Sequence, residues 1–135
     1  MKTLIIILCV FLVLGIVLGV AFSFVDNDVE LIYRDNNGAE IIYKLNGKEA
    51  ERVKDIFTEA TKGINDGYGV RCFASERASV CIGSKKYILS EDSCNVIKKS
   101  KSDYCYEVPK EDFEYLVSLF HKNIESCSLW EWSKN

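Results

Sequence analysis

The chain has 135 residues, of which 48% are hydrophobic, and this length leaves room for one compact domain. Its formal net charge of −3 argues against nucleic-acid binding, because that function relies on clustered lysine and arginine. Six cysteines and a single histidine limit the metal and nucleophile chemistry that the chain can offer.

The N-terminal residues form a segment of their own. No side chain from Thr3 to Val25 is charged, and this run is long enough to cross the hydrocarbon core of a bilayer as a helix. We expect either a retained transmembrane helix, residues 1–25, or a signal peptide cleaved near Ser23, where small residues occupy the positions that signal peptidase reads. Lys2 before the run favours a cytoplasmic N-terminus. Both alternatives make residues 26–135 an extracytoplasmic domain.

The pattern that follows predicts a β-hairpin and then a helix. Two apolar stretches, VELIYR and AEIIYKL, flank residues 35–38, whose Asn and Gly tolerate the left-handed backbone of a tight turn. Asn46 is expected to cap the helix, with Glu49 completing a capping box. The apolar positions of this helix recur at helical spacing and are Ala50, Val53, Phe57, Ala60 and Ile64.

Residues 68–107 change to short β-type runs separated by Ser, Gly, Lys and Asp, which predicts an antiparallel meander of four or five strands. Pro109 then opens a second helix. Its inward stripe is expected to consist of Phe113, Leu116, Val117, Phe120 and Ile124. The order of hairpin, helix, meander and helix is typical of an α+β domain, with two helices packed on a small antiparallel sheet.

Five of the six cysteines lie beyond the apolar run, and an exported domain favours disulfides. Cys72 and Cys81 would face each other on one predicted hairpin, and Cys94 and Cys105 on the next. We therefore expect these two disulfides, with Cys127 as a free or intermolecular thiol, although other pairings of five thiols remain open. No close C-x-x-C pair is present, so we expect no metal, no redox site and no cofactor.

The remaining candidate residues are few. His121, the only histidine, could serve Cys127 as a base, but residues six apart on a helix lie about 120° apart around its axis. We interpret His121 as a helix-terminal residue that interacts with the dipole. Gly15 and Gly19 have the spacing that lets two membrane helices approach closely.

Two groups of residues in the C-terminal part of the chain are possible interaction residues. One is the pair Trp130 and Trp132, and the other is the lysine cluster Lys98, Lys99 and Lys101. The tryptophans could form an interaction epitope or fold back over the sheet. The lysines could contact an acidic partner or anionic lipid, or could simply keep a hairpin tip soluble.

We expect a non-catalytic binding module, membrane-anchored or secreted and stabilised by disulfides, that acts as an inhibitor, an accessory protein or a surface-interaction protein. Its partner would be an unknown protein or envelope component, and a homodimer is a further option. The alternative is a small thiol-dependent enzyme or redox protein that uses Cys127 and His121. The sequence contains no phosphate-binding glycine loop, calcium loop or serine elbow.

Overall fold

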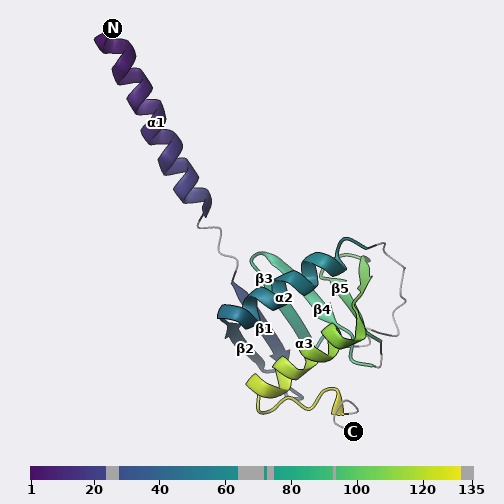
Figure 1. Cartoon of the computed structure of the whole chain (residues 1–135). Coiled ribbons are helices and arrows are strands. Elements are labelled where there is room, and N and C mark those ends of the chain that lie inside the picture. The colour runs from purple at the N-terminus through teal and green to yellow at the C-terminus, as the bar shows by residue number, and fades with distance from the viewer. Residues whose placement is uncertain (24–27, 64–71, 73–74, 93, 132–135) are drawn as a thin grey trace.

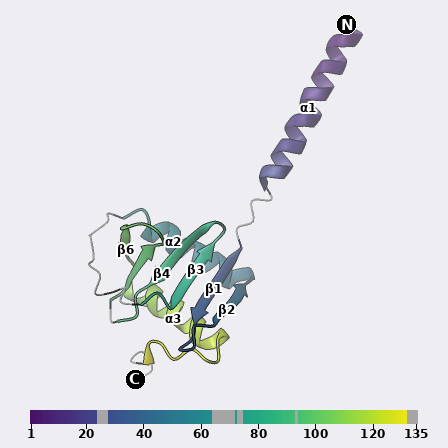
Figure 2. The same ribbon diagram turned by 180° about the vertical axis from the view of Figure 1, so that it is seen from behind.

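The computed structural model describes residues 1–23, 28–63, 72, 75–92 and 94–131, and for residues 17–23 it describes the backbone alone. An N-terminal helix precedes an α+β domain in which two helices lie on one face of an antiparallel sheet (Figure 1). Figure 2, seen from behind, shows the sheet in front of both helices. The predicted α+β class is therefore confirmed.

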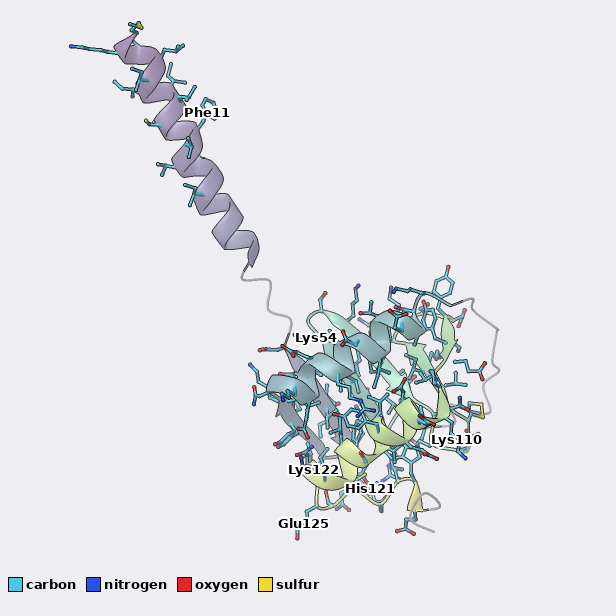
Figure 3. All side chains as sticks on the ribbon, in the orientation of Figure 1. Phe11, Lys54, Lys110, His121, Lys122 and Glu125 are labelled. Atoms are coloured by element: carbon cyan, nitrogen blue, oxygen red, sulfur yellow. A yellow bond between two sulfur atoms is a disulfide. The ribbon has the colours of Figure 1, made fainter. Side chains whose placement is uncertain are left out.

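Helix α1 (Lys2–Ser23) contains most of the uncharged run. Its described side chains are exposed, and Phe11 is an example (Figure 3). No helix in the described part of the chain is both long enough and apolar enough to span a membrane. The expected membrane helix thus has no support from the structure and stays a prediction from sequence.

The sheet has six strands in the order β2-β1-β3-β4-β5-β6, and all neighbouring pairs are antiparallel. The strands are β1 (Val29–Arg34), β2 (Glu40–Leu45), β3 (Ala78–Ile82), β4 (Lys85–Leu89), β5 (Val96–Lys99) and β6 (Cys105–Glu107). Four of them, β3 to β6, form the predicted meander. Strand β1 lies between β2 and β3, so β2 is an edge strand of the sheet.

The predicted hairpin of β1 and β2 is confirmed, and its turn has a clear chemical cause. The Asp35 carboxylate accepts hydrogen bonds from the backbone N–H groups of Asn37 and Ala39, both at 2.8 Å. Gly38 adopts a φ of 81°, the left-handed conformation that glycine accepts without strain. These contacts fix the register in which Arg34 lies opposite Glu40.

Helices α2 (Gly47–Ala60) and α3 (Lys110–Asn123) bury their apolar stripes against the sheet. The predicted core residues of both helices are buried, except Ile64, which lies outside the described residues. The sheet contributes alternate residues of its central strands to the same core, among them Val29, Leu31 and Val80. This alternation assigns one face of the sheet to the helices.

The predicted capping box of α2 is wrong, because Asn46 makes no side-chain cap hydrogen bond. Glu49 instead accepts a hydrogen bond of 2.7 Å from the Lys122 ammonium. The carboxylate therefore joins the first turn of α2 to the last turn of α3, rather than closing its own helix end.

We predict that Leu31→Ala, a truncation on the helix side of β1, lowers the free energy of unfolding by about 2–5 kcal/mol, because Leu31 is fully buried. Ile42→Ala on the neighbouring strand is the matched control, since Ile42 is 57% exposed. We expect that control to change stability by about 0.5 kcal/mol or less. Urea titration of both variants measures the difference, and equal losses would contradict the assigned faces of the sheet.

Candidate functional site

The structure contains one disulfide, between Cys72 and Cys94, whose Cα atoms are 6.2 Å apart. The expected pairs Cys72–Cys81 and Cys94–Cys105 are therefore wrong in the structure, which gives Cys81 and Cys105 as thiols. Cys72 precedes β3 and does not belong to a strand that faces Cys81.

The pairing register explains why both expected bridges fail. Cys81 on β3 lies opposite Glu30 on one side and Lys86 on the other. Cys105 on β6 lies opposite Lys98. The expected two-residue turn at residues 99–100 would instead have placed it opposite Cys94. Each thiol thus faces a charged residue of a neighbouring strand instead of a cysteine.

The disulfide covers part of the sheet face that the helices leave open. A second cluster of buried residues forms there, with Cys94 packed against it, and comprises Cys72, Ile88, Val96 and Cys105. The disulfide thus acts as a clasp over this end of the sheet, a structural role that fits its burial. Burial also raises the pKa of the Cys105 thiol, which makes it a poor nucleophile at neutral pH.

Asp92 lies next to the disulfide. Together, Asp92, Cys72 and Cys94 are the only group of three potential metal ligands among the described residues. One ligand atom from each of Asp92, Cys72 and Cys94 lies within 4.8 Å of the others. The backbone N–H of Cys94 also donates a 3.2 Å hydrogen bond to the Asp92 carboxylate. Since thiolates are the sulfur ligands of zinc, the disulfide form offers no sulfur donor, and the carboxylate serves the local turn.

Cys127 and His121 are the two residues that the enzyme alternative names. Cys127 is 7% exposed and belongs to the main core cluster. The His121 ring packs edge-on against Trp130, with ring centroids 6.3 Å apart. Neither side chain lines the two pockets described below for this domain, one beside Ile41 and one beside Lys85. The burial of Cys127 also opposes an intermolecular disulfide.

Trp130 is a core residue and not a surface epitope. It is 2% exposed, and its indole N–H donates a 2.8 Å hydrogen bond to the backbone oxygen of Ser90. Its ring also contacts Phe120 edge-on at 5.5 Å. Ser90 in turn donates its hydroxyl to the Cys94 backbone oxygen, so the tail after α3 is connected to the clasp. Trp132 lies outside the described residues.

The other predicted site residues remain separate from one another. Gly15 lies in α1, where an added Cβ would meet nothing within 4 Å, and the surroundings of Gly19 are not described. Lys98 and Lys99 lie at the end of β5, and Lys101 lies in the turn that follows, with a φ of 59°. The proposed packing of membrane helices stays a prediction.

The outer edge of β2 is a candidate site that the sequence analysis missed. No strand pairs with this edge among the described residues, and both Ile42 and Tyr43 are exposed, at 57% and 39%. A pocket of about 390 Å³ adjoins the strand at Ile41 and is completed by Asn123, Ile124, Glu125 and Ser126. Figure 3 shows Glu125 just beyond the C-terminal end of α3.

The consecutive residues Ile41, Ile42 and Tyr43 were the signal that could have revealed this edge. Successive side chains of a strand point to opposite faces, so three apolar residues in a row cannot all face the core.

Comparisons with protein-family models, with curated protein sequences and with solved structures found no match to this chain. The functional argument therefore rests on the residues and geometry described above.

We predict that peptide mapping without reduction yields a linked pair containing Cys72 and Cys94. Cys72→Ser should lower the free energy of unfolding by about 3 kcal/mol, because the bond closes a loop with a sequence separation of 22. Cys81→Ser should cost less than about 1 kcal/mol, since this half-buried thiol closes no loop. A linked pair containing Cys81 would contradict the register of β3.

Proposed function

We propose that the chain is a non-catalytic binding module that acts as an inhibitor, an accessory protein or a surface-interaction protein. The observation that carries this proposal is the open edge of β2 with its adjoining pocket. An exposed strand edge presents backbone N–H and C=O groups that an extended segment of another protein can pair with.

The charges on β2 support this assignment. Natural sheets commonly protect an edge with charged residues that point away from the sheet. On β2, however, Glu40 accepts a 3.0 Å hydrogen bond from Arg34 of β1, and Lys44 pairs with Asp28. Both charged side chains of β2 are therefore engaged by residues of β1 or of the segment before it, and Ile42 and Tyr43 are the exposed large apolar side chains of the strand.

The pocket beside Ile41 supplies a basis for specificity. When a strand is added to an edge, its backbone hydrogen bonds provide affinity and pockets for alternate side chains provide selectivity. A partner strand at β2 would direct one set of side chains toward this pocket and the other set toward the side of Ile42. Because Glu125 lies at the pocket, a long side chain with an apolar stem and a basic end group fits its lining.

We further propose that residues 3–25 place this module outside the cell membrane, either as a retained anchor or as a signal peptide cleaved near Ser23. The uncharged run supports export. A disulfide between Cys72 and Cys94 fits an oxidising compartment. The enzyme alternative has no comparable support, because Cys127 lies in the core.

The test is capture of partners from the native envelope with the full chain, using Ile42→Lys/Tyr43→Lys as the edge variant. Both side chains are exposed, so the variant should fold with an unchanged unfolding midpoint. We expect it to lose at least about tenfold in partner binding, because added lysines solvate the edge and block strand addition. Ser118→Lys is the control, since Ser118 is an exposed residue of α3 that belongs to neither β2 nor the adjoining pocket.

Four outcomes are informative. Loss of binding in the edge variant but not in the control supports the proposal. Equal binding by both variants would contradict the edge as the binding site, and recovery of no stoichiometric protein would contradict the binding module. If the captured partner is a second copy of the chain, the size of the complex in solution will identify β2 as a dimer interface.

A further inference from the structure

Two turns of the sheet lie at the end where the chain enters the domain from α1. The backbone N–H of Gly83, in the β3–β4 turn, donates a 3.0 Å hydrogen bond to the carbonyl of Asp28 just before β1. The N–H of Ser100, in the β5–β6 turn, donates a 2.8 Å hydrogen bond to Lys86 at the start of β4. We call this part of the domain, residues 28, 82–86 and 99–104, the entry end; Figure 1 shows it on the side of α1.

The entry end is strongly basic although the whole chain is acidic. Its two turns and the strand ends next to them carry Lys85, Lys86, Lys99 and Lys101. No ion pair among the described residues involves these four lysines. Acidic groups also lie near this end. Asp28 pairs with Lys44 and Glu59 of α2 pairs with Lys62. Glu30 lies opposite Cys81, next to Lys86, and Asp103 lies in the β5–β6 turn.

The opposite end of the sheet has the opposite character. The turns and strand termini there carry five acidic residues against two arginines, Arg34 and Arg77; the acidic residues are Asp35, Glu40, Glu91, Asp92 and Glu107. The positive charge is thus gathered by the topology at one end of a domain whose total charge is negative. Such a separation orients a molecule in front of a negatively charged surface.

Two further features of the entry end suit a lipid headgroup. Tyr104 is 56% exposed in the β5–β6 turn, and tyrosine is enriched at the level of lipid headgroups. A pocket of about 310 Å³ lies between the β3–β4 turn and α2, and the side chains of Lys54, Lys85 and Tyr87 help to line it. Burial raises the pKa of the Tyr87 hydroxyl, so this group keeps its proton and can donate to a phosphate oxygen.

We propose that the entry end binds an anionic lipid surface through the lysines of its two turns. The inference rests on the membrane anchor of the proposed function. If Val25 ends the span, only three residue steps lead to Asp28, and a chain of that length reaches about 10 Å at most. This reach is close to the Debye length of about 8 Å at physiological salt, so the lysines stay within the field of the headgroups.

The test uses the full chain in nanodiscs of phosphatidylcholine, either alone or mixed with phosphatidylglycerol. Acetylation by an amine-reactive reagent, followed by mass spectrometry, reports the accessibility of each lysine. We expect acetylation of Lys85, Lys86, Lys99 and Lys101 to slow about fivefold in the anionic nanodiscs alone, and to recover at high salt. Lys110, at the opposite end, should react equally in both.

Paired variants make the test specific. Lys85→Glu/Lys99→Glu should abolish the shielding of Lys86 and Lys101, whereas Arg34→Glu/Lys110→Glu, with the same change in net charge, should preserve it. Equal acetylation in both kinds of nanodisc would overturn the proposal. Shielding that neutral lipid also produces, or that high salt does not remove, would overturn it too.

Failure of the anchor has a different signature. In that case the chain does not enter nanodiscs of either composition. The entry end is then tested by co-sedimentation of the full chain with phosphatidylglycerol vesicles. Binding that Lys85→Glu/Lys99→Glu lowers and the control variant does not would support the basic end without the anchor. Equal sedimentation with phosphatidylcholine vesicles would overturn it.

Discussion

The packing of both α2 and α3 on the same face of the sheet is the constraint on which the rest of this structure depends. A sheet with apolar residues on both faces must cover the second face by other means. Here the covered face receives Val29, Leu31 and Val80, and the other face carries Ile88 and Val96. The Cys72–Cys94 disulfide covers this second face over β4 to β6 only.

The division of the second face explains where the candidate sites lie. Over β4 to β6, the disulfide packs against the second cluster and covers part of it. On β2 no comparable cover is described, and the exposed Ile42 belongs to this open part. The helices cover one face of the sheet, and the disulfide covers part of the other. The surface that stays available to a partner therefore includes the edge strand β2.

Local patterns in the sequence predicted the elements of the fold well. The hairpin of β1 and β2 follows from its turn residues, and the buried stripes of α2 and α3 follow from helical spacing. The cysteine pairing could not be predicted in the same way, because it depends on register. Strand β3 pairs with β1, which lies far earlier in the chain, and this long-range pairing places Cys81 opposite Glu30. Likewise, the burial of Trp130 depends on long-range contacts, among them its hydrogen bond to the Ser90 carbonyl. The basic turn of Lys99 and Lys101 was visible in the sequence, but its proximity to the β3–β4 turn is a product of topology.

Tyr33 has a consequence for how the chain is made. This fully buried residue of β1 lies within hydrogen-bonding distance of Ser128, at 3.3 Å from its hydroxyl to the Ser128 hydroxyl and to the Ser128 backbone nitrogen. One of the earliest strands to leave the ribosome therefore waits for nearly a hundred further residues before its surroundings are complete. During synthesis the chain passes through a stage in which β1 is apolar, uncovered and unable to finish folding. Release of the C-terminal residues from the ribosome is therefore the event that allows the tertiary structure around Tyr33 to close.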